Sequence, residues 1–171
     1  MRTNDAAVDQ FHNSGFEYLK LIYQIKDTQG EDSSERTSPH FLPLLALQTA
    51  RLAIEGYVDQ VGRGIDLAWD ESYCDTASIK ERIATIYNKT GKPVEFKKGI
   101  WEEALTLFDM AGLIQKNLAE FKNAREEEIP ESYKDVARKY PVHLSLAIAE
   151  QAVEALLTCS NCRVNPGSYT V

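Results

Sequence analysis

The sequence is poor in the residues that cross-link or interrupt a fold. It has 3 cysteines, 6 prolines and 9 glycines in 171 residues. A chain of this length can bury about 70% of its unfolded surface, so it needs neither disulfides nor a metal to fold. So few prolines and glycines exclude a loop-rich β-sandwich and favour a helical domain.

Long apolar runs are also missing. No stretch approaches the ~18 consecutive apolar residues of a membrane span. The first ten residues are polar and lack the basic-then-apolar order of a secretory signal peptide. We therefore expect a cytoplasmic protein with no membrane partner.

Basic residues are outnumbered by acidic ones. The chain carries 19 Lys and Arg against 26 Asp and Glu, a formal net charge of -7. Duplex DNA repels such a surface unless a local basic stripe overcomes the repulsion. The sequence has no dense Lys/Arg block. The nearest are Lys97-Lys98 and the scattered set Lys116, Lys122, Arg125, Lys134, Arg138 and Lys139. The composition therefore excludes a duplex DNA-binding domain of the usual basic kind.

What the chain does contain is apolar residues at helical spacing. The spacing predicts helices over about 8–25, 39–70, 76–88, 99–123, 130–140 and 141–156. No strand-like alternation and no internal repeat competes with this interpretation. We therefore expect an all-α fold, an up-and-down bundle of four long helices plus short helices. Residues 1–163 would form a single domain, and 164–171 a loose tail.

Three cysteines bear on metal and redox chemistry. Cys159 and Cys162 have the spacing of zinc ligands and of redox disulfides, but a structural zinc site needs four ligands, and only Cys74 and three scattered histidines remain. A redox pair usually begins a helix, whereas this pair falls at a helix end. We expect reduced thiols without a role.

Other cofactor motifs are incomplete. A di-iron bundle needs two carboxylate-x-x-His pairs, and the sequence has one, Asp9 with His12. Gly62 and Gly64 follow a predicted helix rather than a strand, which excludes a phosphate-binding loop. We therefore expect no metal and no cofactor.

The most apolar predicted helix carries charged residues one turn apart. Glu55 and Asp59 are separated by one turn, and Arg51 lies one turn before Glu55. One interpretation is a surface triad of alternating charge. The other is that Glu55 is a buried carboxylate that needs a partner and orients a group near a functional groove.

Arg138 and His143 form the most suggestive pair for catalysis. Four residues separate them at the entrance to the last predicted helix. Arginine can stabilise the charge that develops on a phosphorane, and histidine can act as a general acid or base near neutral pH. Together they could cleave RNA through its 2′-hydroxyl without a metal.

The order of these features resembles the HEPN superfamily of small helical bundles, many of them RNA-associated. The similar stretches are LALQTA at 45–50, IEGY at 54–57 and LAEFKNAR at 118–125, followed by a further helix after a proline. The resemblance covers roughly 41–159. It is a similarity of pattern and implies a helical bundle that pairs into a homodimer.

Active HEPN ribonucleases share an arginine, a following polar residue and a histidine four to six residues on. At Lys122-Asn123, lysine replaces the arginine and Glu127 stands where histidine is expected. The Arg138 and His143 pair keeps both residues but has Lys139 and Pro141 inside the motif. In an active enzyme His143 would be the general acid/base and Arg138 the phosphate stabiliser. The neighbouring surface for single-stranded RNA would comprise Lys122, Asn123 and Arg125.

These patterns favour a catalytically degenerate, nucleic-acid-associated or protein-interaction module that forms a homodimer. Metal-independent ribonuclease activity and a small-molecule-binding bundle are the alternatives. The alanines at 46, 50 and 53 and the apolar face of 101–121 could supply a dimer surface or could be ordinary core.

Overall fold

The computed structural model describes residues 14–28, 38–114, 118–121 and 124–160. The α-helices are α1 Ser14–Thr28, α2 Phe41–Ile65, α3 Ile79–Lys89, α4 Ile100–Ile114, α5 Glu131–Lys139 and α6 Val142–Ser160. Short helical turns are η1 Asp70–Cys74, η2 Leu118–Phe121 and η3 Glu126–Glu128. No strand occurs within these ranges, and the all-α prediction is confirmed.

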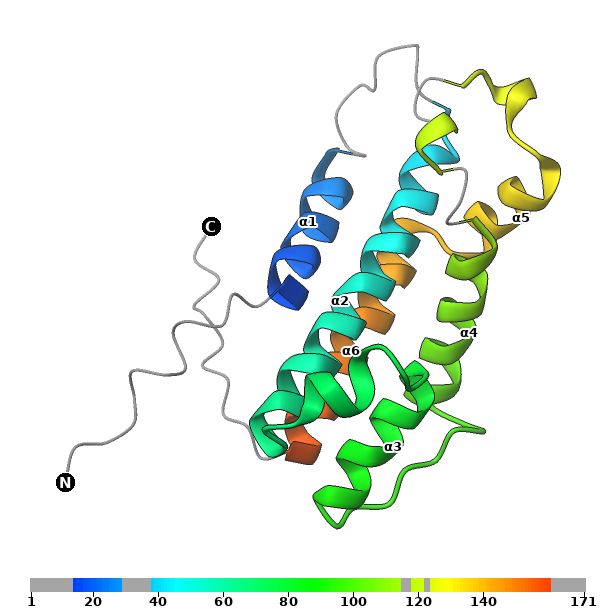
Figure 1. Ribbon diagram of the computed structural model, residues 1–171. Helices are drawn as coiled ribbons and strands as arrows, with labels where there is room; N and C mark the ends of the chain where they lie inside the picture. The colour runs from blue at the N-terminus through cyan, green and yellow to red at the C-terminus, as the bar shows by residue number, and fades with distance from the viewer. Residues whose placement is uncertain (1–13, 29–37, 115–117, 122–123, 161–171) are drawn as a thin grey trace.

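The four long helices alternate in direction along the chain. In Figure 1, α1 runs upward, α2 downward, α4 upward and α6 downward, which is the predicted up-and-down order. The helices α2 and α6 run side by side in the same direction through the middle of the bundle. The helices α1 and α4 pack on opposite sides of this pair, and α3 packs against both α2 and α6.

Small residues let the two central helices approach closely. Ala46, Ala50 and Ala53 on α2, and Ala149 and Ala152 on α6, have no exposed surface. Close packing of this kind maximises dispersion contacts between helix backbones. The alanine-rich stripe of α2 is therefore core and offers no surface to a second copy.

The apolar face of α4 is core for the same reason. Trp101, Leu107 and Ile114 are buried in the bundle together with residues of α2 and α6. Of the two interpretations open for the face of 101–121, ordinary core is the one that the structure supports at these positions.

The fourth helix ends earlier than its sequence pattern predicts. Its expected end was residue 123, but α4 stops at Ile114 and the chain continues as η2 at Leu118–Phe121. The buried Phe121 packs with Ala124 and Ile129 against Phe41 at the start of α2. This satellite cluster lies around the start of α2, and a straight helix through 123 would not place its residues there.

Local signals set the limits of α3. Ser78 caps its first turn, since Ser78 Oγ accepts a hydrogen bond from the Glu81 N–H and Glu81 accepts one from the Ser78 N–H at 2.7 Å. After the helix, Gly91 adopts a positive φ of 69°, which glycine tolerates at little steric cost.

Other predicted boundaries agree within a few residues or cannot be compared. α1 continues to Thr28, and residues 8–13 of its predicted range lie outside the described residues, as does the expected tail at 164–171. Among the described helices, α6 is long and apolar enough to cross a membrane by length and composition. Half of that apolar window is buried inside the bundle, as in the core helix of a globular fold.

Candidate functional site

The predicted catalytic arginine lies in the last turn of α5. Arg138 is exposed, and its Nη1 donates hydrogen bonds to Glu131 at 2.8 Å and to Asp135 at 2.7 Å. The hydrogen bond to Glu131 is the main cause that raises the pKa of the guanidinium further. A phosphate that approached Arg138 would compete with two carboxylates for the same donor nitrogen.

The predicted catalytic histidine lies in the first turn of α6. His143 is exposed, and its ring has no hydrogen bond or ion pair with another described residue. Tyr140 and Pro141 separate α5 from α6, so Arg138 and His143 belong to different helices. No hydrogen bond or ion pair joins Arg138 to His143 in the described part of the chain.

Of the three basic and polar residues expected to bind single-stranded RNA, the structure describes only one. Lys122 and Asn123 lie outside the described residues. Arg125 is exposed at the start of η3, where its backbone N–H donates to Glu128 Oε2 at 2.6 Å. Among the described residues, no hydrogen bond connects Arg125 to Arg138 or His143. The proposed RNA-binding surface therefore stays a prediction.

Glu55 belongs to a salt-bridge cluster that ties α3 to α2. The Arg82 guanidinium donates through Nη2 to Glu55 at 2.6 Å and through Nη1 to both oxygens of Asp59 at 2.8 and 3.0 Å. Only 7% of the Arg82 side chain is exposed. Burial opposes its charge, but the hydrogen bonds to Asp59 and Glu55 outweigh burial and raise its pKa.

This arrangement agrees with one part of the second interpretation of Glu55. Glu55 is a half-buried carboxylate with a buried partner, and that partner is Arg82, while its role near a functional groove stays a prediction. The guanidinium is enclosed by carboxylates, so it offers no charge to a ligand. Arg51, the third member of the expected triad, places its guanidinium 5.7 Å from the centre of the Phe108 ring on α4. The cluster holds helices together.

Sequence reasoning missed Arg82, although a signal was present. Arg82 occupies a position within the apolar face of α3, between Ile79 and the buried Ile83 and Ile86. A lone arginine on an apolar helix face must find a carboxylate partner when the face is buried. Its partner could not be named, because 23 and 27 residues separate Arg82 from Asp59 and Glu55.

A second charged cluster holds the start of α2. Glu126 in η3 accepts a hydrogen bond from Ser38 Oγ at 2.7 Å and lies 3.0 Å from His40 Nδ1. The hydrogen bond from Ser38 is the main cause that lowers the pKa of Glu126. In a catalytic triad the serine hydroxyl would donate to the imidazole, whereas here it donates its hydrogen bond to the carboxylate. The cluster is an anchor between η3 and α2.

The two described cysteines are poorly placed for reaction. Burial, followed by a hydrogen bond to Asp70, raises the pKa of the Cys74 thiol to about 12. Cys159 is buried, and its Sγ lies 3.0 Å from Thr90 Oγ1. Cys162 lies outside the described residues. In the described ranges, no group of three or more metal-ligating side chains comes together. Asp9 and His12 lie outside those ranges.

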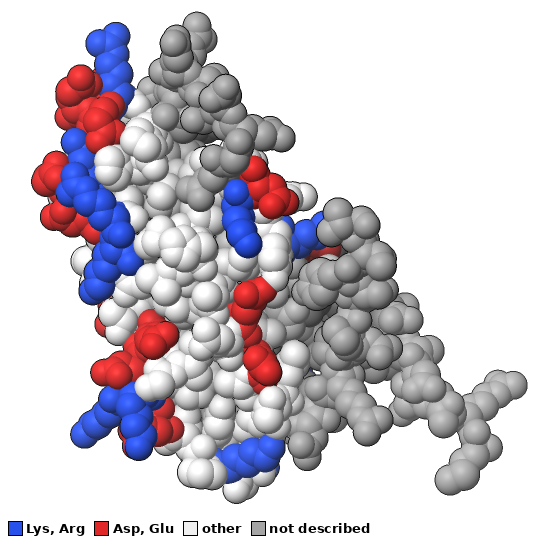
Figure 2. Space-filling model, turned by 180° about the vertical axis from the view of Figure 1, so that it is seen from behind, with Lys and Arg blue, Asp and Glu red and all other residues white. Residues whose placement is uncertain are grey.

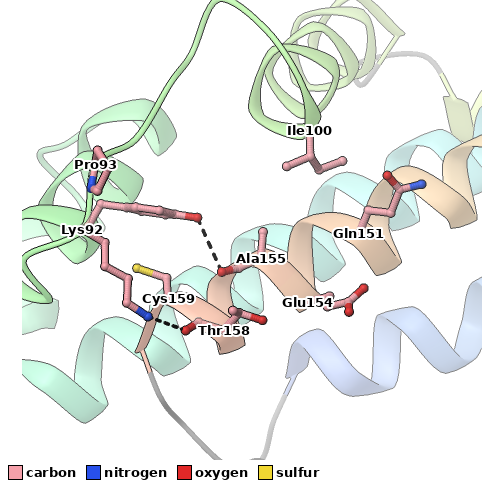
Figure 3. Close-up of a pocket in the computed structure, with 9 residues that line it drawn as sticks. Lys92, Pro93, Ile100, Gln151, Glu154, Ala155, Thr158 and Cys159 are labelled. Atoms are coloured by element: carbon pink, nitrogen blue, oxygen red, sulfur yellow. Dashed lines mark hydrogen bonds between the residues drawn. The ribbon is translucent and has the colours of Figure 1, made fainter.

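A shallow groove of about 550 Å³ opens beside the C-terminal half of α6 (Figure 3). Its walls come from α6, from the end of α3 and the loop after it, and from Ile100 at the start of α4. Tyr87 OH donates to the Ala155 carbonyl at 3.4 Å, and Lys92 Nζ donates to the Thr158 carbonyl at 2.7 Å. Two of its hydrogen-bonding groups are thus used internally, and Glu154 and Gln151 lie at its edge.

The exposed side of α6 carries little charge. Figure 2 shows this face, with Lys, Arg, Asp and Glu along its left edge, acidic groups down its middle and an uncharged area between the two. The outward residues of α6 are His143, Leu144, Ala147, Gln151, Glu154 and Thr158, all exposed or half-buried. Glu154 is the one carboxylate among these six, and the half-buried Glu150, two turns after His143, is a second carboxylate on this side of α6.

Comparisons with known proteins supply no role for these residues. No family model, no curated protein and no solved structure matches the chain. Function is therefore inferred from the geometry and charge of the side chains themselves.

Proposed function

We propose that this chain is a non-catalytic protein-interaction module that binds its partner through the outer face of α6. The observation that carries this proposal is that Glu150 and Glu154 are the only Asp, Glu, Lys or Arg residues among the exposed or half-buried residues described on α6. Interfaces between proteins are depleted of charged residues at their centres. The six outward residues of α6 fit that composition, because five of them carry no carboxylate, lysine or arginine.

The charges of α5 favour a protein partner over RNA. Arg138 is shared by Glu131 and Asp135, and Lys134 lies 3.6 Å from both Glu126 and Glu131. Each of these cations is thus accompanied by carboxylates, which reduce the attraction to a phosphate backbone. The net charge of -7 acts in the same direction.

Metal-independent RNA cleavage is the second candidate. It is favoured by the exposed His143 ring, which has no partner among the described residues and lies five positions after an exposed arginine. A HEPN-like architecture, a homodimer and a cytoplasmic location belong to the proposal as well. The alternating order of the long helices supports the HEPN-like assignment.

Two measurements test the proposed function. A photo-crosslinking amino acid at Gln151, on the outer face of α6, should give protein adducts in cells. The same group at Gln24, an exposed glutamine on α1, is the matched control and should give far fewer. Equal adducts at both positions would contradict the proposal.

The second measurement is cleavage of a mixed single-stranded RNA pool in EDTA. We expect no cleavage by the wild-type chain or by His143→Ala. Cleavage by the wild type that is lost in His143→Ala would overturn the non-catalytic assignment and establish the ribonuclease. Equal cleavage by both would indicate a contaminating nuclease, and a repurified sample should then be inactive.

A further inference from the structure

The outer surface of α6 divides into two strips that differ in charge. The strip toward α3 and α4 is the groove, whose described lining includes the uncharged Ala155 and Ile100. The strip toward α1 carries Glu150 and Glu154, which lie one helical turn apart. No lysine or arginine accompanies them among the exposed or half-buried residues described on α6. The face therefore combines an uncharged groove with an acidic flank.

Neither carboxylate of the acidic flank is paired with a cation in the described part of the chain. Glu154 is exposed and has no hydrogen bond or ion pair with another described residue. Glu150 is half-buried, and its hydrogen bond comes from the neutral hydroxyl of Tyr23 on α1. Burial raises the pKa of Glu150, as expected of a carboxylate with no cation beside it. Both carboxylates therefore keep their attraction for an external cation.

The cation that lines the groove has a different partner. Among the described lining residues, Lys92 is the one cation, and its Nζ donates a hydrogen bond to the Thr158 carbonyl at 2.7 Å. Thr158 lies in the last turn of α6, where a positive charge complements the negative end of the helix dipole. Lys92 thus compensates the end of the helix and leaves Glu154 unpaired.

We propose that the partner of this face is a basic amphipathic helix, which seats an apolar side chain in the groove and sets two lysines or arginines against Glu150 and Glu154. This inference rests on the proposed function and names the chemistry of its partner. Residues four apart on an α-helix are separated by about 6 Å along its axis, so two cations one turn apart match the carboxylate pair. A helix that lays its apolar side in a groove is a recurring mode of protein recognition.

The charge of the whole chain favours the same partner. A net charge of -7 attracts a basic segment from a distance and raises its rate of association. Salt screens exposed charges beyond about 8 Å at physiological ionic strength, so binding should weaken as salt is added. An acidic segment would instead meet two unpaired carboxylates at close range, and this repulsion gives the face its specificity.

A matched pair of model peptides tests the class of partner. The probe is a helical peptide of about 15 residues with a leucine stripe flanked by lysines, and its counterpart has glutamate at every lysine. In fluorescence anisotropy with the full chain, the lysine peptide should bind about tenfold or more tightly than the glutamate peptide. Its dissociation constant should rise as sodium chloride is increased from about 50 to about 300 mM.

Three variants locate the binding site on the chain. Glu154→Lys should weaken binding of the lysine peptide about fivefold or more, because it replaces an attraction with a repulsion. Glu127→Lys makes the same change in net charge on the exposed surface of η3, at the other end of the bundle (Figure 1), and should alter binding less than about twofold. Ala155→Gln fills the floor of the groove without a change in charge and should weaken binding about threefold or more.

Three results would overturn the proposal. They are no binding of the lysine peptide at about 1 mM, equal binding of the two peptides, and equal weakening by Glu154→Lys and Glu127→Lys. Crosslinks from position 151 separate this failure from failure of the proposed function. If those crosslinks reach a protein in cells but the peptides give any of the three results, the interaction module stands and the basic partner is wrong.

Discussion

Gly62 lies directly against the indole ring of Trp69. A methyl group added at Gly62 would come within 2.0 Å of one ring atom and within 2.4 Å of two others. Trp69 has no exposed surface, and its Nε1 donates a hydrogen bond to Asp59 at 3.1 Å. The same Asp59 binds Arg82, so the glycine makes room for the residue that closes the salt-bridge cluster.

This contact predicts opposite effects of one substitution at two neighbouring glycines. Gly62→Ala should lower the free energy of unfolding by about 1–3 kcal/mol, because the buried indole must move. Gly64→Ala, two residues on in the same helix, meets no atom within 4 Å. It should raise stability by about 0.5–1 kcal/mol through better helix propensity. Urea unfolding of both variants checks this, and a similar shift in both would contradict it.

The buried Arg82 and the exposed Arg138 should differ sharply in their contribution to stability. Arg82→Met leaves the half-buried carboxylates of Glu55 and Asp59 without their partner and should cost about 3 kcal/mol. Arg138→Met removes exposed ion pairs to Glu131 and Asp135 and should cost much less, because solvent screens them. Urea denaturation at one protein concentration measures both. Equal losses would show that the Arg82 cluster is not a structural tie.

Glu150 predicts a pH dependence of stability. Its side chain on α6 accepts a hydrogen bond from Tyr23 on α1, and burial raises its pKa. A raised pKa means that the folded chain holds the proton more tightly than the unfolded chain. The stability from this group is complete below the ordinary glutamate pKa of about 4.3 and is lost as the pH rises through the folded value.

Glu150→Gln tests that sign, because glutamine keeps the acceptor oxygen and removes the charge. The variant should be more stable than wild type at pH 7, and the difference should disappear near pH 3.5, where the carboxyl is protonated in both states. Urea midpoints at the two pH values measure it. An advantage of equal size at both pH values would rule out the charge as its source.

The described thiols should resist modification in the folded chain. In a Cys162→Ser variant, Cys74 and Cys159 remain. With a pKa of about 12, Cys74 has on the order of a thousandfold less thiolate at pH 8 than an ordinary cysteine. Cys159 is 3% exposed. Both should react slowly with Ellman's reagent until urea is added, and one thiol equivalent reacting rapidly without urea would contradict the structure.

Local patterns predicted most of the helices and some of their limits. The apolar spacing located α2, α3, α5 and α6 to within a few residues, because one face of each must be buried. The predicted end of α3 at about residue 88 lies next to the observed end at Lys89, and Gly91 just beyond it adopts a positive φ. The end of α4 could not be predicted, because the packing of Phe121 against Phe41 depends on a contact across the bundle.

For the charged residues too, the sequence predicted part of the arrangement and packing between helices decided the rest. The sequence placed Glu55 and Asp59 on one helix and predicted that a buried carboxylate there needs a partner. Only the packing of α3 against α2 identified Arg82 as that partner. Likewise, the anchor between Ser38, His40 and Glu126 joins segments that are more than 80 residues apart, and no local spacing indicates it.

By itself, therefore, the sequence determined an all-α chain of four long alternating helices, because helical periodicity and capping act over a few residues. The tertiary structure decided that the alanines of α2 are core, that Arg138 is shared by two carboxylates and that the outer face of α6 exposes few charged residues. Those outcomes depend on which helix faces meet, and that is decided by packing between residues far apart in the chain.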